Sequence, residues 1–483
     1  MIVLQLLHSP FAFLVLFLVL FLSTLGIVAL SQWLLFLRPL NIGAEHFRAK
    51  RYEEAASAFQ TVLKRRPPPG IEADTRRRLA DTFDVLGRGE DAAQERERAG
   101  SAALNAAKDP TALIAQGDLL RRQHCYDDAC RMYENALGQM PTGIFPSARA
   151  QIMAKLTVAH FGAGRPTETL RWAKAALTSS PTKDIRRLME SMAGVAASDQ
   201  GDLETAEAHY RAAFALAEAG GNPEEIAQSL ATLADIQRKR GHLAEALATA
   251  RCAVVACDSP FRGGRLAQIE SLREMGRFDE ARAAIDLMKQ GPRHDQPNVE
   301  RRMQAMCALS LAWIEAADDR PEAALPALEE AREHLKAASR STVWPPPPAG
   351  GEDKLGLYCD STQMRVQVQL GHQEVAERLR TSVESRILRY ADDRSLLMSV
   401  YGQFARAAYF EGDFAQSQEF LQRYLECKPS PIGLPTVYYW LGETHLRLGE
   451  ADAARESFRQ AVVPGIDSLD ARRAAARLQD IGG

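Results

Sequence analysis

The stretch LGETHLRLGEADAARESFRQA, residues 441–461, contains a pattern that recurs along most of the chain. Gly449 stands five residues before Ala454, the ring of Phe458 follows four residues after Ala454, and Ala461 follows seven residues after it. A glycine ends one helix because it tolerates a left-handed turn, and small residues then let a second helix approach the first. The stretch therefore predicts a hairpin of two antiparallel helices joined at Gly449.

The same register fits further stretches when each is aligned on the small residue equivalent to Ala454. We call these aligned residues the markers, and they are Ala55, Ala92, Ala129, Thr169, Ala206, Ala246, Ala281, Ala324, Ala376, Ser417 and Ala454. A glycine stands five residues earlier in most units, and a second small residue stands twelve residues earlier, although units seven and nine have Ile269 and Met364 there. Because a lone hairpin leaves an apolar face uncovered, the sequence predicts an all-α solenoid of about eleven stacked hairpins.

The pattern resembles that of the tetratricopeptide repeat (TPR) family, which has a Leu-Gly pair, an aromatic residue, a glycine turn, then Ala, Phe, Ala and Pro. The residues that carry the resemblance best are Leu441, Gly442, Gly449, Ala454, Phe458 and Ala461 in the last unit, and Gly117, Tyr126, Ala129, Tyr133, Ala136 and Pro141 in the third. The resemblance covers residues 36–465. It implies a right-handed superhelix whose first helices line a concave face that binds protein or peptide segments.

Placing the units on the family's pattern assigns a set of side chains to this concave face. They are Asp118, Arg121, Arg122, Phe161, Asp235, Arg238, Lys239, Arg273, Arg406, Tyr409, Tyr439, Glu443 and Arg447. The mixture is basic with aromatic support, which suits a partner with acidic and apolar side chains. The alternative for each residue is a solvated polar position with no partner.

An apolar segment precedes the repeats. Residues 11–30, FAFLVLFLVLFLSTLGIVAL, have the length needed to cross a bilayer, and no charged side chain comes before Arg38. We expect a retained transmembrane anchor over residues 1–37; a cleaved signal peptide is the alternative, but a basic start and a small-residue cleavage site are not evident. The positive residues after the segment place the N-terminus outside and the repeats in the cytoplasm. They are Arg38, Arg48, Lys50 and Arg51.

The expected organisation has four parts. Residues 1–37 form the anchor, residues 38–287 form units one to seven, residues 288–465 form units eight to eleven, and residues 466–483 form a C-terminal capping helix and tail. The proline-rich segment 343–351, VWPPPPAGG, is expected to be an extended spacer, with a ligand for a proline-binding module as the alternative.

Composition and motifs exclude several functions. The net charge of −3 lacks the basic excess expected for nucleic-acid binding. The seven cysteines lack C-x-x-C spacing and are expected to be reduced, and the ten histidines are dispersed. No phosphate-binding, dinucleotide, zinc-protease or nucleophile-elbow motif occurs. We therefore expect no enzyme activity, no cofactor, no metal and no small-molecule substrate.

The anchor-then-repeats layout is similar to that of the lipopolysaccharide assembly protein B family, an adaptor in envelope synthesis. That family ends in a pair of metal-binding C-x-x-C motifs, whereas this chain ends in DIGG without them. The likeness therefore implies only a membrane-tethered scaffold or adaptor that assembles proteins on the cytoplasmic side. The alternatives are an envelope-assembly or secretion factor with the repeats outside the cytoplasm, and an enzyme with an unrecognised site.

Overall fold

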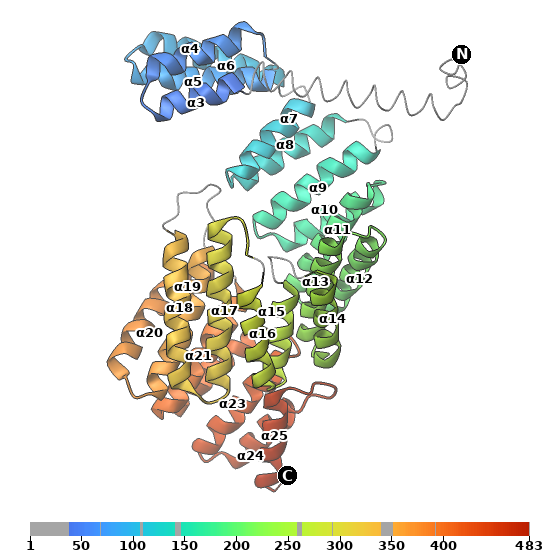
Figure 1. Ribbon diagram of the computed structural model, residues 1–483, viewed down its shortest axis with the longest axis vertical. Coiled ribbons are helices and arrows are strands. Elements are labelled where there is room, and N and C mark those ends of the chain that lie inside the picture. The colour runs from blue at the N-terminus through green and yellow to red at the C-terminus, as the bar shows by residue number, and fades with distance from the viewer. Residues whose placement is uncertain are drawn as a thin grey trace, which may run out of the picture. The chain divides into compact units, whose positions relative to one another are not determined.

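The structure is a computed structural model that describes residues 38–482, except residues 68, 107–109, 141–145, 258–262, 292, 340–350 and 392. All regular elements in these described ranges are helices, which confirms the predicted all-α class (Figure 1). In chain order they are α3 (Arg38–Arg48), α4 (Tyr52–Lys64), α5 (Pro69–Val85), α6 (Gly89–Ala106), α7 (Pro110–Arg122), α8 (Tyr126–Gln139), α9 (Pro146–Gly162), α10 (Pro166–Thr178), α11 (Lys183–Asp199), α12 (Leu203–Glu218), α13 (Pro223–Lys239), α14 (Leu243–Ala256), α15 (Gly263–Glu274), α16 (Phe278–Gln290), α17 (Pro297–Ala317), α18 (Pro321–Ser339), α19 (Gly351–Gln369), α20 (Gln373–Ile387), the short 3₁₀ helix η2 (Leu388–Tyr390), α21 (Arg394–Glu411), α22 (Phe414–Glu426), α23 (Gly433–Arg447), α24 (Ala451–Ala461) and α25 (Leu469–Asp480).

The chain divides into two compact units. Unit 1 runs up to Arg165 and includes Thr178–Pro181, and unit 2 holds Pro166–Leu177 and the chain from Thr182 onward. The predicted boundary at residue 288 is a different one, and it lies within unit 2. Each unit is described by itself below.

The marker residues confirm the repeat register. Each of them lies on the second helix of a hairpin, from Ala55 on α4 to Ala454 on α24. Their exposed fractions are 0 or 1%, including those of the two polar markers, Thr169 and Ser417. Only a small side chain fits where two helices approach this closely, which explains the preference for alanine.

The turn between the two helices of each repeat hairpin has the same backbone conformation throughout. The predicted turn glycines all have positive φ, and they are Gly87, Gly164, Gly201, Gly241, Gly276, Gly371, Gly412 and Gly449. In the three repeat hairpins that lack this glycine, the equivalent residues also have positive φ: Lys50 (58°), His124 (61°) and Asp319 (57°). The hairpin geometry therefore imposes a left-handed residue even where the side chain disfavours it.

Several hairpins are closed by a glycine packed against an aromatic ring. A Cβ added to Gly442 would lie 2.4 Å from a ring carbon of Phe458, and one added to Gly117 would lie 2.5 Å from Tyr133. In the seventh repeat hairpin, Ile269 replaces the small residue. It shares a buried cluster with Ile285, which stands where other repeats have an aromatic ring. The two positions therefore share one volume, because a larger residue on the first helix leaves no room for a ring on the second.

The first helices form the inner layer of unit 2. From α13 onward, successive first helices contact one another directly, as α13 and α15 do, and as α19 and α21 do. Successive second helices in the described part of this unit barely touch. A curved stack brings its inner helices together and spreads its outer ones, so the inner face of unit 2 is the face of the first helices.

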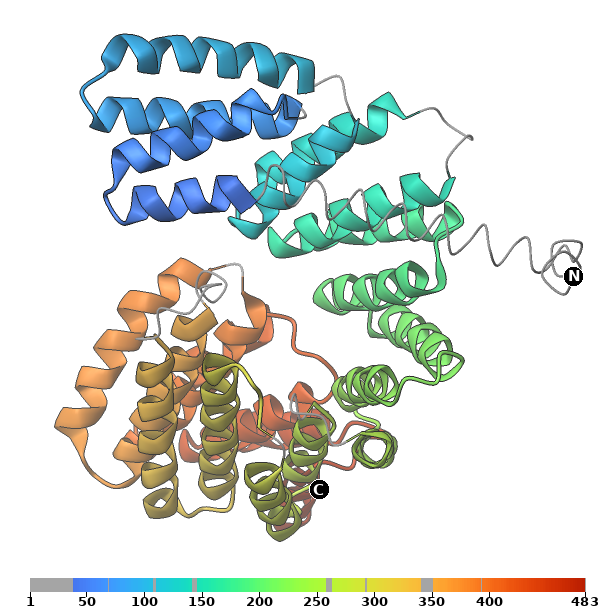
Figure 2. The same cartoon turned by 45° about the horizontal axis from the view of Figure 1, so that its top comes forward.

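Unit 2 also closes on itself through its C-terminal elements (Figure 2). Ile432 and Ile466 share a buried cluster with Leu243. On α25, Arg472 donates to the carbonyl of Met275 over 2.5 Å, and Arg473 donates to that of Ala317 over 3.4 Å. The helix predicted for residues 466–483 therefore does more than cover the last hairpin, because it also contacts turns far back in the chain.

The N-cap of α25 is Ser468. Its side chain accepts a hydrogen bond from the backbone N–H of Ala471 over 3.2 Å. Ala474 on the same helix packs against Phe458, which covers the apolar face of the last hairpin. This is the role expected of a terminal helix in a repeat array.

Two predictions fall outside the described residues. They concern the anchor over residues 1–37 and nearly all of the proline-rich segment 343–351, of which only the last residue is described. Among the helices between residues 38 and 482 that the structure describes, none combines the length and the apolar character needed to span a bilayer.

Candidate protein-binding face

The predicted residues of unit 1 lie on α7 and α9. The carboxylate of Asp118 accepts hydrogen bonds from the hydroxyl of Tyr133 and from Lys155 Nζ, each over 2.7 Å. Burial by itself would raise the pKa of Asp118, but these two hydrogen bonds and the charges of Lys155 and Arg121 outweigh it and lower the pKa. Asp118 is therefore already engaged in joining three helices.

The other predicted residues of unit 1 are more open. Arg122 is exposed at the end of α7, and Arg121 is half-buried. Phe161 on α9 leaves 43% of its surface exposed. Arg122 and Phe161 are available for contact, in contrast to Asp118.

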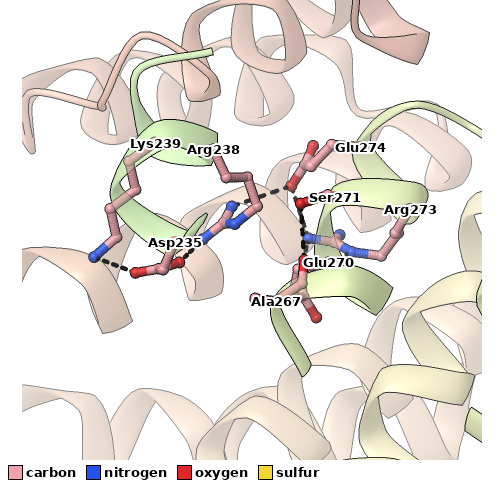
Figure 3. A network of polar contacts seen from close by, with 8 residues as sticks. All are labelled: Asp235, Arg238, Lys239, Ala267, Glu270, Ser271, Arg273 and Glu274. Carbon is pink, nitrogen blue, oxygen red and sulfur yellow. Dashed lines mark hydrogen bonds and ion pairs between the residues drawn. The ribbon is translucent and has the colours of Figure 1, made fainter. Parts of the chain in front are cut away.

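Four predicted residues of unit 2 come together where α13 meets α15 (Figure 3). Asp235 accepts from Arg238 over 2.7 Å and pairs with Lys239 at 3.0 Å. Burial would raise the pKa of Asp235, but the charges of Arg238 and Lys239 lower it to about 2. Asp235, Arg238 and Lys239 thus pair with one another on α13.

Arg273 on α15 is paired by two acidic residues that the sequence analysis did not name. Its Nη2 atom lies 2.7 Å from Glu270 and 2.8 Å from Glu274. Glu274 also lies 3.8 Å from Arg238, which links the two helices. The missed signal was the three-residue spacing of Glu270 and Arg273, which puts both on the same helix face. We call Asp235, Arg238, Lys239, Glu270, Arg273 and Glu274 the inner polar cluster, and its formal charges sum to zero.

An aromatic residue extends this cluster toward α19. The guanidinium carbon of Arg273 lies 5.6 Å from the ring centre of Trp313 on α17. The indole N–H of Trp313 donates to the hydroxyl of Thr362 on α19 over 3.0 Å. The inner faces of α15, α17 and α19 are thus joined by polar and cation–π contacts.

The remaining predicted residues lie on α21 and α23. The ring of Tyr409 packs edge-on against Trp440 at 5.4 Å, and its hydroxyl accepts from Arg447 Nε over 3.1 Å. Phe410 packs on the same tryptophan at 6.0 Å and leaves 40% of its surface exposed. We call Tyr409, Phe410, Phe414, Trp440 and Arg447 the aromatic group. It offers rigid, partly exposed rings beside a cation, a combination frequent at protein-binding sites.

Tyr439 and Glu443 are engaged inside the protein. Glu443 is buried and accepts from Arg477 of α25 over 3.0 Å. Tyr439 packs against Phe458 and Trp440. These two residues therefore hold the terminal helix, and the structure gives them less surface for a partner than the sequence implied.

The structure describes the predicted face as separate groups. One lies on α7 and α9 in unit 1, and the inner polar cluster and the aromatic group lie in unit 2. Within the described ranges, no three His, Cys, Asp or Glu side chains are arranged to hold a metal ion. All seven cysteines are free, and Cys130, Cys307, Cys359 and Cys427 are buried.

A comparison with protein families bears on the repeats. A family model described as "Tetratricopeptide repeat" matches residues 403–471, which hold α22, α23 and α24 and the markers Ser417 and Ala454. This segment is therefore similar to tetratricopeptide repeats. No curated protein matches the chain.

Three solved structures are examples of those that resemble this chain. A tetratricopeptide repeat protein from Parabacteroides merdae is 15% identical with a TM-score of 0.38, and the match covers 62% of this chain and 99% of that one. A Rap protein complexed with competence and sporulation factor is 16% identical with a TM-score of 0.39, covering 81% and 97%. A human IFIT1 dimer with PPP-AAAA is 12% identical with a TM-score of 0.42, covering 82% and 90%. Likeness at this level carries no information about function.

Proposed function

We propose that this protein is a membrane-tethered TPR scaffold that binds protein or peptide segments on its first helices and assembles them at the cytoplasmic side of the membrane. The observation that carries the proposal is the inner layer of first helices in unit 2. This layer presents the inner polar cluster, and the aromatic group lies on the later helices of the same unit. Stacked hairpins supply such extended surfaces without any further domain.

The chemistry of the aromatic group favours one kind of partner. Arg447 is a cation beside Tyr409, and Phe410 adds exposed apolar surface. Aromatic and arginine side chains contribute most of the binding energy in many protein interfaces. A polypeptide with alternating acidic and apolar side chains would match both features.

The tether in the proposal comes from the sequence. Residues 11–30 are apolar along a length that matches a bilayer, and positive residues follow them from Arg38. The positive flank supports the orientation with repeats in the cytoplasm. Placement of the repeats outside the cytoplasm, as in an envelope-assembly or secretion factor, is the second candidate.

The proposal does not include catalysis. In the inner polar cluster, acidic and basic side chains pair with one another, as Asp235 does with Arg238 and Glu270 does with Arg273. Such pairs fix helices and orient charges toward a partner, whereas a catalytic group needs a free acid, base or nucleophile beside a substrate.

Crosslinking in the native membrane followed by affinity capture tests the scaffold role. We expect the full chain to capture a partner that a protein beginning at Arg38, the first residue of α3, does not retain. We also expect the double variant Tyr409→Ser, Arg447→Gln to lose that partner. The matched control is Arg423→Gln, which removes an exposed arginine paired with Glu419 on α22. Equal capture by all four proteins would contradict the proposal.

A separate experiment tests the orientation. A reporter fused after Gly483 that is active only in the cytoplasm should be active in cells, and protease added to intact spheroplasts should leave the repeats uncut. Cleavage of the repeats under these conditions would favour the second candidate.

A further inference from the structure

Arg365 on α19 is a buried cation that has no partner among the residues that the structure describes. Its exposed fraction is 4%, and its Nε atom is buried without a hydrogen-bond partner. Its side chain makes no hydrogen bond or ion pair with any residue that the structure describes. A guanidinium group remains charged in proteins, and burying it without a partner is strongly unfavourable. Something outside the described chain must therefore satisfy it.

A second arginine lies close to it. The helix that carries Arg406, α21, packs directly against α19. Burial, followed by the charge of Arg406, lowers the pKa of Arg365, while Asp319 at the exposed turn after α17 opposes this without forming an ion pair. Arg406 donates from Nε to the carbonyl of Gly402 on its own helix over 2.9 Å and makes no ion pair within the described residues. The two arginines thus differ from those of the inner polar cluster, which are all paired.

Two carboxamides accompany these arginines. Gln369 follows Arg365 by four residues, and Gln403 precedes Arg406 by three, so each shares a helix face with its arginine. Each has a buried amide oxygen that lacks a hydrogen-bond partner among the described residues. Rotation of the side-chain amide exchanges its C=O and NH2 groups, so either side chain can supply an N–H donor.

We propose that Arg365 and Arg406, assisted by Gln369 and Gln403, form a binding site for one carboxylate group between α19 and α21. The planar fork of a guanidinium matches a carboxylate with two parallel hydrogen bonds. A doubly charged phosphate fits less well because Glu274 and Asp470 act on Arg406 from nearby, and their negative charges would repel it more strongly. Two sources share this chemistry: an acidic side chain of a bound polypeptide, which rests on the proposed function, and a free small carboxylate.

The binding experiment uses the full chain in detergent micelles and two probes. The first is a fluorescein-labelled peptide of three Ala-Glu-Leu repeats with an amidated end, and the second is glutarate. Arg365→Gln and Arg406→Gln should each weaken binding of the responsive probe at least about tenfold, as expected for loss of a charge-assisted hydrogen bond. Arg423→Gln should bind as the unchanged protein does, and a peptide with Gln in place of Glu should not bind.

Each outcome either tests whether the site binds a carboxylate or identifies the source of that carboxylate. Peptide binding that depends on Arg365 supports the site with a polypeptide carboxylate, and glutarate binding that depends on Arg365 supports it with a free carboxylate. Binding of neither probe, or binding that is insensitive to both arginine variants, overturns the proposal and leaves water as the group that satisfies Arg365.

Thermal unfolding separates a binding role from a structural one. In buffer without carboxylates, Arg365→Gln should unfold at the same temperature as the unchanged protein or higher, because it removes an uncompensated buried charge. A lower unfolding temperature of the Arg365→Gln variant, together with unchanged probe binding by the Arg406→Gln variant, would overturn the proposal.

The partner capture described above distinguishes failure of this site from failure of the scaffold role. A partner that is lost with the Tyr409→Ser, Arg447→Gln variant but retained by Arg365→Gln would refute the polypeptide source alone. Glutarate binding that depends on Arg365, in a protein that captures no partner, would support the site and refute the scaffold role.

Discussion

Asp118 in unit 1 is half-buried, and its carboxylate is held by Tyr133 and Lys155 from the two helices that follow. Its pKa lies below the ordinary 3.8, although burial alone would raise it. A carboxyl group whose pKa is lower in the folded state stabilises the protein above its unfolded-state pKa. That stability is lost as the pH falls through the lower, folded-state value.

We expect Asp118→Asn to lower the free energy of unfolding of unit 1 by about 1–2 kcal/mol at neutral pH, because it removes a charged acceptor from a half-buried network. The difference from the unchanged protein should shrink as the pH falls below about 3.8. Denaturant unfolding between pH 3 and 7 measures it. Asp128→Asn is the control, since Asp128 pairs with Arg131 in an exposed pair that solvent screens and that should contribute little to stability. Equal losses for both variants at neutral pH would contradict the assignment.

The inner polar cluster shows which residues could be assigned to the inner face from the sequence and which contacts could not be predicted. Asp235 and Arg273 were placed on the inner face because the family's pattern covers their positions. Glu274 has no place in that pattern, and its role depends on the packing of α13 against α15. Arg365 lies in unit nine, where Met364 interrupts the small-residue pattern, so no position in the pattern pointed to it. Pairing and its absence depend on neighbouring helices and are invisible in a single repeat.

At the scale of the element, the hairpin turn requires a left-handed residue. Gly371 has φ 79° and nothing within 4 Å of an added Cβ, whereas Lys50 holds φ 58° without the freedom of glycine. The sequence predicted the glycine turns from spacing alone. The turns at Lys50, His124 and Asp319 could not be recognised in this way, because their conformation is enforced by the packing of the helices on either side.

We expect Lys50→Gly to raise the free energy of unfolding of unit 1 by about 1 kcal/mol, because glycine relieves the left-handed strain of a residue with a Cβ. The reverse change, Gly371→Ala, should lower that of unit 2 by a similar amount even though the methyl group meets nothing. Denaturant unfolding of each variant measures both effects. Changes of the same sign in the two variants would show that backbone conformation is not the cause.

The contact of glycine with an aromatic ring leads to a second prediction for hairpins. Gly442→Ala should lower the free energy of unfolding by about 1–3 kcal/mol, because its methyl group would lie 2.4 Å from the ring of Phe458. Combining it with Phe458→Leu should cost less than the sum of the two single changes. Gly138→Ala is the control, since it is exposed on α8 with nothing near its Cβ and should be stabilising. Strict additivity at residues 442 and 458 would contradict a shared volume.

At the scale of the whole molecule, the closure of unit 2 could not be predicted. Arg472 and Met275 are 197 residues apart, and no local pattern indicates that they meet. The repeat register predicts only contacts between neighbouring hairpins. The closing contacts depend on the cumulative curvature of many hairpins, which small differences in helix length and packing angle determine.

We expect Ile466→Ala to lower the free energy of unfolding of unit 2 by about 2–4 kcal/mol, because Ile466 is buried against Leu243 and Ile432. Hydrogen exchange should also accelerate at the turn around Gly241, where Ile466 packs. Val462→Ala is the control, because Val462 leaves 40% of its surface exposed. Unchanged exchange at that turn in the Ile466 variant would show that the closure does not stabilise it.

The closing contacts also set an order of events during synthesis. The turns at Gly241 and Gly276 leave the ribosome well before Ile466 and Leu469, which complete their packing. During that interval the apolar surface of Leu243 lacks its later neighbours and is open to chaperones. Translation that stops before Ile432 and Ile466 would leave this surface uncovered, and such products should be recognised by proteases even though the preceding hairpins are intact.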